Sequence, residues 1–457
     1  MTEDSPVQVV IVGGGFGGLS AASTLAKAPL HLTLIDRKNY YTFQPLLYQV
    51  ATAGLSPGEI AAPLRSILRR HQNVEVLLGE VIGFDLDRRT VNLADCEVPY
   101  DYLIVAAGAG HTYFGHNDWE AIAPSLKGIE DALEIRRRVL LAFELAERRA
   151  VARQPALPLN FVIVGAGPTG VELAGTLAEI CHHALTHEFR NIDPARAHIL
   201  LIEGGPRVLA AYPEDLSRSA ERQLKHLGVD VRTSTMVDQI EPGAVRFGNT
   251  RLEAAVVLWA AGVAASPLGR KIGVPLDREG RVIVHSDLSI PDHPEVFVIG
   301  DMASLKDERG KLLPGVAQVA MQEGRFVANL IRKEILQGAP RFPHSEPEGG
   351  NLSRPAFHYH DKGSLATIGR AAAVAEIGKL HMSGYPAWLT WLFVHILFLI
   401  GFRNRLLVMI QWAWSYFNYE RGARLITGSN SLPGWTGLPN SAPSTPVPQE
   451  NRSHAAD

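Results

Sequence analysis

Two glycine-rich turns in this chain share one spacing, which suits binding of a dinucleotide. Their glycines are Gly13, Gly15 and Gly18 in the first copy and Gly165, Gly167 and Gly170 in the second. In such a turn the first glycine permits a tight bend, the second lets the backbone approach a pyrophosphate, and the third allows a helix to pack closely on its strand. A tight strand-to-helix turn without a ligand is the alternative for either copy.

An apolar strand that ends in an acid follows each turn. The first strand starts at His31 and ends at Asp36, and the second starts at His198 and ends at Glu203. A carboxylate at this place accepts hydrogen bonds from ribose hydroxyls and repels a 2′-phosphate, so Glu203 favours NADH over NADPH. Two dinucleotide sites in one chain indicate a flavin and a nicotinamide, because hydride transfer needs a donor and an acceptor.

Further elements must position these sites. Apolar strands ending in small residues are predicted at 102–108, 256–262 and 296–301, and each should end where a ligand lies. Asp301, at the end of the last one, suits the ribityl-phosphate end of the same FAD, with a helix N-cap as the alternative. Pro and Gly at its start and Gly after its end predict a helix over 314–336.

The composition excludes several classes of protein. The chain has 457 residues, of which 46% are hydrophobic, and a net charge of −3, which argues against nucleic acid as a partner. Cys96 and Cys181 form no CxxC pair, so neither a disulphide scaffold nor a dithiol reductase is indicated, and a reducing compartment is expected. No targeting segment is recognised at the N-terminus. His182, His183 and His187 lack a completing ligand, so we predict no metal site.

The segment 385–419 is a compositional outlier that holds four of the seven tryptophans. An apolar run over 388–402 predicts one helix of about 22 Å, shorter than the bilayer core of about 30 Å. Extending that helix would bring Arg403 and Arg405 into hydrocarbon. We therefore expect a helix that lies in the membrane interface, with a buried core or dimer-interface helix as the alternative.

Together, the glycine turns, the two acids, and the motifs at 105–108, 259–262 and 300–301 resemble the two-dinucleotide-binding-domain flavoprotein superfamily. Residues 43–57, the Ala-Gln-x-Ala-x-Gln motif at 317–322 and the aromatic C-terminal region are similar to the type II NADH:quinone oxidoreductases. The resemblance covers about residues 7–427.

The resemblance implies an α/β fold with two Rossmann-like dinucleotide-binding domains, the second inserted in the first, and a C-terminal amphipathic helical region that associates with the membrane. The expected boundaries are 1–120 and 291–345 for the FAD-binding domain, 121–290 for the NADH-binding domain, 346–428 for the membrane-associating and dimerisation region, and 429–457 for a disordered tail.

Site residues are also implied by the resemblance. FAD contacts are implied for Gly13, Gly14, Gly15, Phe16, Gly17, Asp36, Arg37, Val81, Asp301, Ala317 and Gln318. Further cofactor contacts are expected from Gly18, Tyr41, Thr52, Ala107, Gly108, Gly165, Gly167, Pro168, Thr169, Gly170, Glu203, Gly262 and Lys379. Val81 is placed on a strand continuing from Val74, and for Lys379 an exposed turn is the alternative.

Three residues are predicted to take part in catalysis. Gln318 and Gln322 lie at i and i+4 on one helical face near a helix N-terminus, where their amides can meet a flavin edge and a quinone carbonyl. A solvated polar face is the alternative. Glu172 is expected close to flavin and nicotinamide, where a buried carboxylate of raised pKa can move protons, or else it only interacts with the helix dipole. We read His395, inside the apolar run, as a hydrogen-bonded core residue.

The predicted activity is hydride transfer from NADH to FAD, followed by transfer of two electrons to a membrane quinone, menaquinone or ubiquinone. No segment of 18 apolar residues is present to carry a proton path, so no ion transport is expected. The predicted protein is a homodimer, peripheral on the cytoplasmic face of the cell membrane. The alternatives are a soluble NADH-dependent reductase of an iron–sulfur protein and a redox-responsive binding protein; sulfide:quinone chemistry is disfavoured by the positions of the cysteines.

Overall fold

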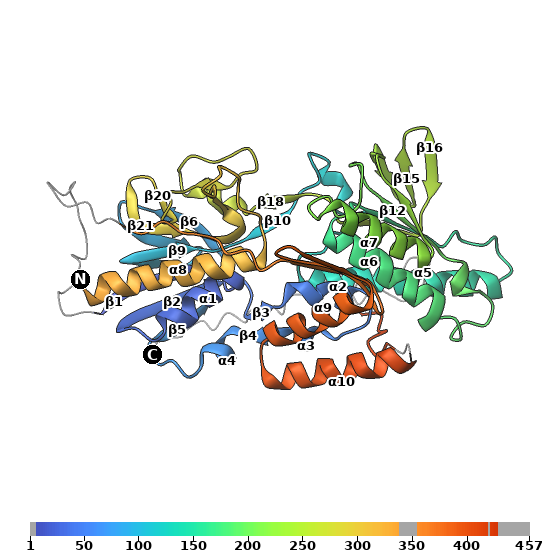
Figure 1. Ribbon diagram of the computed structural model, residues 1–457, viewed down its shortest axis with the longest axis horizontal. Helices are drawn as coiled ribbons and strands as arrows, with labels where there is room; N and C mark the ends of the chain where they lie inside the picture. Colours follow the sequence, from blue (N-terminus) through green and yellow to red (C-terminus); the bar gives the residue numbers. More distant parts are fainter. Residues whose placement is uncertain (1–5, 338–353, 419–420, 428–457) are drawn as a thin grey trace, which may run out of the picture. The chain divides into compact units, whose positions relative to one another are not determined.

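Residues 6–337, 354–418 and 421–427 are described by a computed structural model (Figure 1). The tail predicted over 429–457 lies outside these residues. One part of the described chain is organised around a six-stranded sheet in the order β20-β21-β9-β1-β2-β5. Its strands are β20 (Ser289–Ile290), β21 (His293–Val298), β9 (Tyr102–Val105), β1 (Val7–Val12), β2 (Leu30–Asp36) and β5 (Val74–Leu78). All pair in parallel except β20, and β1, β2 and β9 are almost continuously buried, as parallel strands covered on both faces require.

A second sheet has the order β13-β12-β11-β17 and is parallel throughout. Its strands are β11 (Asn160–Val164), β12 (His198–Ile202), β13 (Val229–Arg232) and β17 (Val256–Trp259). The chain leaves the first sheet after β9 and returns to it at β20, so the second sheet is inserted between these strands. The chain passes between the two sheets twice, through β10 (Ala109–His111) and β18 (Val263–Ala265), and these two strands pair with each other in antiparallel orientation. The predicted fold class is thereby confirmed.

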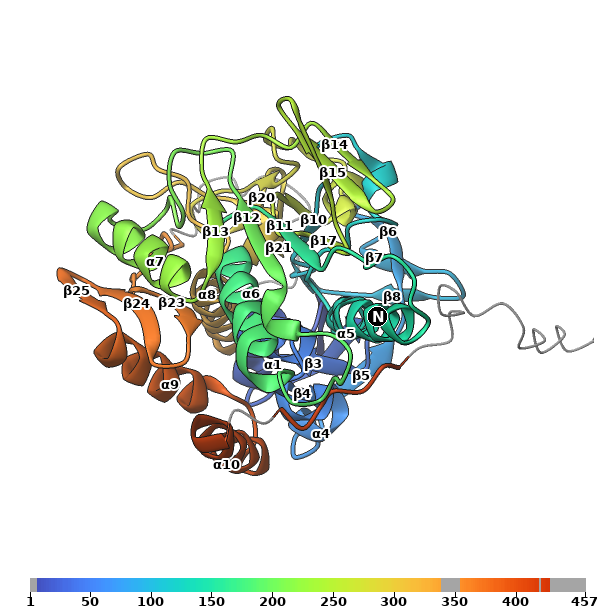
Figure 2. The same cartoon turned by 90° about the vertical axis from the view of Figure 1, so that its right-hand side faces the viewer.

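Helices cover both sheets. They are α1 (Phe16–Leu25), α5 (Ile129–Val151), α6 (Pro168–Glu179), α7 (Glu214–His226) and α8 (Ala317–Leu336). α6 packs on β11 and β12 (Figure 2). α1 packs on α8 so closely that a Cβ on Gly324 would lie 2.3 Å from the carbonyl oxygen of Gly17.

One predicted helix boundary was wrong. The helix expected over 314–336 begins at Ala317, because Val316 has extended backbone angles and acts as the N-cap. Pro314 and Gly315 therefore belong to the loop before the helix.

The C-terminal region is a three-stranded antiparallel sheet followed by two helices. Its elements are β23 (Ser364–Gly369), β24 (Ala372–Ile377), β25 (Leu380–Ser383), α9 (Tyr385–Phe398) and α10 (Phe402–Asn418). β23 lies on α6, where a Cβ on Gly175 would stand 1.6 Å from the carbonyl oxygen of Ile368. Among the described residues, none of the helices has both the length and the apolar character needed to cross a bilayer.

The prediction of one helix over 388–402 was wrong. α9 ends at Phe398 and α10 starts at Phe402. α9 ends because Leu399 has extended backbone angles (φ −65°, ψ 132°), and Gly401, with φ +87°, then redirects the chain directly before α10. Arg405 Nε donates a hydrogen bond of 2.7 Å to the carbonyl oxygen of Leu399, so the turn is also held from the second helix.

Shorter elements complete the described chain. They are β3 (Tyr40–Thr42), α2 (Leu47–Ala51), α3 (Pro57–Ile60), β4 (Ala61–Pro63), α4 (Leu64–Leu68), β6 (Val81–Asp85), β7 (Thr90–Leu93), β8 (Glu97–Pro99), β14 (Gln239–Glu241), β15 (Ala244–Phe247), β16 (Thr250–Glu253), β19 (Val282–Ile283) and β22 (Ala303–Ser304). The strand predicted to continue from Val74 to Val81 was wrong. β5 ends at Leu78, opposite Asp36, because its partner strand β2 ends at Asp36, and β6 joins a different sheet.

Candidate functional site

The two glycine turns are structural copies of each other. Gly13 has φ +105° and Gly165 φ +100°, values that side chains rarely permit. A Cβ on Gly18 would lie 1.8 Å from the Gly13 carbonyl oxygen, and a Cβ on Gly170 would lie 1.8 Å from that of Gly165. The first and third glycines are therefore required by the fold itself, in both copies.

The second glycines have a different role. No atom lies within 4 Å of the position of a Cβ on Gly15 or on Gly167. Each is the N-cap of its helix, with φ −76° and −69°, and neither conformation needs a glycine. The space above each helix N-terminus is therefore left open by the protein, where backbone N–H groups and the helix dipole favour an anion. This geometry fits a pyrophosphate in both copies.

Both acids are held by backbone amides in the same way. Asp36 Oδ2 accepts a hydrogen bond of 2.6 Å from Gly14 N, and Glu203 Oε2 accepts one of 2.6 Å from Ala166 N. The other oxygen of each carboxylate accepts from the amide two residues further along, at 2.7 Å. Each carboxylate is thus fixed beside its glycine turn, with lone pairs left for ribose hydroxyls.

The strands beside the two turns end differently. Gly108 has φ +68° and its Cβ position is open, as the site residues Ala107 and Gly108 require. Gly262 has φ +77°, but Phe114 and Thr112 both lie 2.8 Å from its Cβ position. The Cβ position of Gly262 is therefore filled by protein atoms, whereas that of Gly108 is open, although both glycines are half-buried.

Asp301 stands after β21 and lines a cavity of about 20 Å³ together with Gly300 and Glu323. Glu323 is only 1% exposed, and its Oε2 accepts a hydrogen bond of 2.5 Å from Gly300 N. Burial raises the pKa of Glu323 to about 8, against the opposing effect of that hydrogen bond. This carboxyl was not among the predicted site residues, although an acid between Val319 and Val327 on the apolar face of the helix was a usable signal.

The amides of Gln318 and Gln322 meet the backbone that precedes β23. Gln318 Nε2 donates to the Gly363 carbonyl at 2.9 Å, and Gln322 exchanges two hydrogen bonds with the backbone of His360, at 2.9 and 3.0 Å. Gln318 Oε1 is buried and has no partner among the described residues. The start of α8 is thus not an entirely solvated polar face, and it presents an unpaired acceptor.

Lys379 lies in the turn between β24 and β25 and is exposed. Its hairpin nevertheless ends near the start of α8, because a Cβ on Gly363 would lie 3.0 Å from Ile377 Cα, and the Gly363 carbonyl accepts from Gln318. The structure therefore places the β24–β25 hairpin near the start of α8, but among the described residues it shows no contact of the Lys379 side chain there.

Glu172 lies on the second turn of α6, where it keeps partial solvent access. Surrounding protein desolvates the carboxyl and raises the pKa of Glu172 well above its usual range, although a backbone hydrogen bond to Thr367 opposes the shift. The negative charge of Glu172 in turn contributes to the raised pKa of Tyr48 and of Tyr212. α2, β23 and the loop after β12 therefore lie around this carboxyl, and the desolvation they cause favours its protonated form.

Of the other predicted contact residues, Tyr41 and Arg37 lie near the first glycine turn and its acid, whereas Thr52 contacts the chain after α10. Tyr41 is buried and its ring meets that of Phe16 edge-on, at 5.4 Å between centroids, beside the first glycine turn. Arg37 is exposed next to Asp36. Thr52 is buried, but its carbonyl oxygen accepts a hydrogen bond of 3.1 Å from Arg421 Nη1. Thr52 is thus joined to the chain that follows α10.

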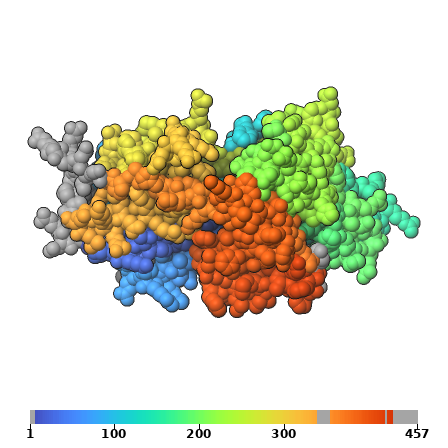
Figure 3. All heavy atoms as spheres, in the orientation of Figure 1, coloured from blue at the N-terminus to red at the C-terminus, as the bar shows by residue number. Residues whose placement is uncertain are grey.

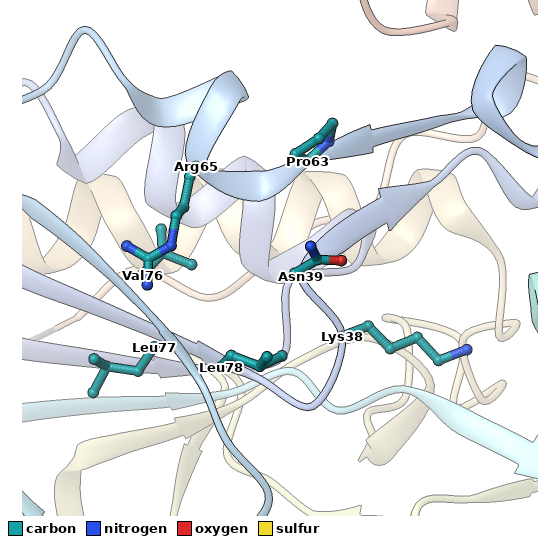
Figure 4. A pocket seen from close by; sticks show the side chains of 7 residues that line it. All are labelled: Lys38, Asn39, Pro63, Arg65, Val76, Leu77 and Leu78. Carbon is teal, nitrogen blue, oxygen red and sulfur yellow. The ribbon is translucent and has the colours of Figure 1, made fainter.

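A further cavity, of about 80 Å³, opens beyond the end of β2 (Figure 4). It is lined by Lys38, Asn39, Pro63, Arg65, Val76, Leu77 and Leu78. The Lys38 side chain points away from that of Arg65 in this view. The volume is well below the about 300 Å³ of a small-molecule site, so this cavity does not enclose a whole cofactor by itself.

Each Rossmann-like unit carries one dinucleotide cradle, by which we mean the glycine turn together with the acid held beside it: Gly13–Gly18 with Asp36, and Gly165–Gly170 with Glu203. Two such units define a class, the flavin- and nicotinamide-binding oxidoreductases. Residues 7–324 match the family model described as pyridine nucleotide-disulphide oxidoreductase, and residues 361–418 match the NDH2 C-terminal domain.

Two proteins of Mycobacterium tuberculosis, the type II NADH:quinone oxidoreductases Ndh and NdhA, are 43% and 44% identical to this chain. The alignments cover 93% and 92% of this chain and 91% and 89% of the relatives. The chain therefore belongs to the type II NADH:quinone oxidoreductase family. A structure of NDH2 from Plasmodium falciparum in complex with NADH has the same fold, with a TM-score of 0.79 over 93% of this chain and all of the other, at 21% identity.

Proposed function

We propose that this chain is a flavoenzyme that oxidises NADH and reduces a membrane quinone. The observation that carries the proposal is the duplicated cradle, with an open second glycine and an amide-bound acid in each copy. The curated relatives named above carry this activity in their names.

FAD fits the first cradle. The N-terminus of α1 would meet its pyrophosphate, and Asp36 the hydroxyls of its adenosine ribose. Asp301, beside the Cβ position of Gly315 at 3.3 Å, would take the ribityl-phosphate end. The unpaired Oε1 of Gln318 is an acceptor suited to an N–H group of the flavin ring.

NADH fits the second cradle. The N-terminus of α6 would face its pyrophosphate, and Glu203 would hold the ribose and repel the phosphate of NADPH. Two arginines near Glu203 are engaged elsewhere: Arg207 donates to the carbonyl oxygens of Ala210 and Tyr212, and Arg232 donates to Asp230. Neither is held for a 2′-phosphate.

The chemistry that FAD supplies when bound is acceptance of a hydride from NADH and delivery of two electrons to a quinone. Quinone reduction also consumes protons. Glu172, whose pKa is raised by desolvation, is the group we assign to their supply. Gln322, one helical turn beyond Gln318, is the residue that we propose orients the quinone carbonyl.

The two C-terminal helices favour a lipid surface. α9 buries Trp391 and His395 against the protein and exposes large apolar side chains along its other side, and α10 continues that exposed surface. The exposed residues are Tyr385, Leu389, Phe393, Leu397, Phe398, Phe402, Leu406, Met409, Ile410, Trp414 and Phe417. α9 and α10 lie at the molecular surface on the face shown in Figure 3, where they are coloured orange and red. Such a surface suits the interface of a bilayer, from which the quinone comes.

We place the enzyme on the cytoplasmic face of the membrane, where NADH is available, and propose a homodimer. The test of the lipid surface is flotation with liposomes at low and high salt. Apolar anchoring is insensitive to screening, so wild-type protein should float in both. Phe393→Ser combined with Phe402→Ser should reduce flotation by at least tenfold, since each exposed phenylalanine contributes about 1.5–3 kcal/mol when buried.

Phe114→Ser is the matched control, because Phe114 and Phe393 are both 67% exposed but only Phe393 lies on α9. It should float like wild type. Full-length protein that stays unbound at both salt concentrations, yet forms a dimer that the double variant loses, would place the apolar surface between two copies. The proposed activity is tested separately, by NADH oxidation with a water-soluble quinone.

A further inference from the structure

Met236 is the most exposed large apolar side chain of the loop that follows β13. It is 69% exposed. Its neighbour Val237 packs into a hydrophobic core cluster, so the two side chains point in opposite directions. Met236 is not simply loose on the surface, because its Sδ lies 2.5 Å from the Cβ position of Gly204. The thioether thus occupies the place that a side chain at residue 204 would take, directly after Glu203.

The loop is tied to the backbone around Glu203. Ser234 N donates to the Gly205 carbonyl at 2.7 Å, and Thr235 N donates to the Glu203 carbonyl at 2.9 Å. Ser234 also has φ +51°, a conformation that costs energy in a non-glycine residue and is held here by these bonds. The loop is therefore built to keep Met236 over the end of β12.

The sheet order places this loop at one end of the bound coenzyme. The glycine turn follows β11, Glu203 ends β12, and β13 lies on the far side of β12 from β11. With the pyrophosphate at the turn and the ribose at Glu203, the next group of NADH, the adenine, extends towards the end of β13. That end carries Met236.

The first cradle repeats the arrangement. β5 lies on the far side of β2 from β1, and Gly79 N in the loop after β5 donates to the Asp36 carbonyl at 3.0 Å, as Thr235 N does to Glu203. The chain directly after β5 and the chain after β13 thus each donate a backbone hydrogen bond to the carbonyl of the acid.

We propose that Met236 is the platform on which the adenine ring of NADH stacks, which makes it a specificity residue for adenine-bearing ligands. This rests on the proposed function, which assigns NADH to the second cradle. A thioether is polarisable and makes favourable contacts with aromatic rings. Because residue 204 is a glycine, nothing intrudes between the thioether and the backbone beneath it.

The test is a comparison of ligands with and without the adenine. ADP-ribose contains the adenosine and both phosphates, and reduced nicotinamide mononucleotide contains only the other end of NADH. Calorimetry on the FAD-loaded enzyme gives the Kd of ADP-ribose, and stopped-flow flavin reduction gives the apparent Kd of NADH and of the mononucleotide.

Met236→Ala should weaken ADP-ribose and NADH by about 2- to 10-fold, leave the mononucleotide unchanged, and leave the limiting rate of flavin reduction unchanged. Met236→Leu should keep most of the affinity. Leu336→Ala, which truncates a similarly exposed apolar side chain at the end of α8 (64% exposed), should alter none of these values.

Unchanged ADP-ribose binding in Met236→Ala, or an equal loss for the mononucleotide, would overturn the proposal. Failure of the wild-type enzyme to bind ADP-ribose at all would instead refute the assignment of NADH to this cradle.

Discussion

Gly15→Ala and Gly167→Ala test the two cradles one at a time. Both glycines have φ near −70°, which alanine adopts freely, and a Cβ at either position meets no atom within 4 Å. Neither substitution should therefore harm the protein without ligands. The unfolded chain loses freedom when alanine replaces glycine, so a small gain of about 0.4–1 kcal/mol in stability is expected.

These substitutions should lower the affinity for the dinucleotide, because its pyrophosphate must approach the backbone. A hydrogen bond to an anion needs about 2.9 Å between nitrogen and oxygen, and an added methyl group keeps the ligand further away. Hydrogen bonds to charged groups contribute about 1.5–3 kcal/mol, so the loss of one weakens binding by about 10- to 150-fold. Gly15→Ala should lose FAD, whereas Gly167→Ala should keep FAD and bind NADH that much more weakly.

The assays are flavin absorbance after dialysis, the apparent Kd of NADH from stopped-flow reduction, and the melting temperature of the flavin-free protein. Gly18→Ala and Gly170→Ala are the matched controls. A Cβ in either would stand 1.8 Å from a carbonyl oxygen, so these variants should be destabilised with or without ligands. Loss of FAD in Gly167→Ala together with normal FAD in Gly15→Ala would show that the cradles were assigned the wrong way round; no effect in either would refute the reasoning.

Four further predictions concern other residues. Glu203→Ala should relax the preference for NADH over NADPH, and comparable wild-type rates with both coenzymes would contradict this. Gln322→Leu should leave flavin reduction by NADH unchanged but slow its reoxidation by quinone in stopped-flow experiments; slower reduction would be the opposite result. Arg421→Met should destabilise the protein by about 3 kcal/mol, because it removes the 2.9 Å ion pair from the carboxylate of Glu179, whose side chain is only 12% exposed, and adding Glu179→Gln should restore part of the melting temperature. Wild-type stability should fall as pH rises from about 4.5, where the unfolded Glu323 carboxyl ionises, to about 8, the pKa of Glu323 in the folded protein, while Glu323→Gln should lack this slope; parallel melting curves for the two proteins would exclude it.

The dinucleotide cradles could be predicted from the sequence because their requirements are local. A positive φ at Gly13 and the 1.8 Å approach at Gly18 arise within a single turn of chain, so residue type and spacing are enough to reveal them. The acids Asp36 and Glu203 follow from the same unit, one strand later. The family was recognisable for the same reason.

The break at 399–401 was not predicted, because a run of apolar residues has the same appearance whether it forms one helix or two. Gly401 was the local signal, and the hydrogen bond from Arg405 to Leu399 exists only after the chain has turned. The exposed and buried sides of α9 also depend on which side meets the protein, since almost all of its residues are apolar.

The two dinucleotide cradles and the apolar character of the C-terminal region were therefore determined by the sequence itself. Glycine spacing, the two acids and the strong aromatic content are local features, which act on the backbone and its solvation over a short range. Tertiary structure alone decided the surroundings of Glu172, the partners of Gln318 and Gln322 and the place of Met236. Each of these depends on contact between segments that are distant in the chain. Such contacts arise only when the whole core has packed and the entropy of closing the intervening loops has been overcome, so no local pattern encodes them.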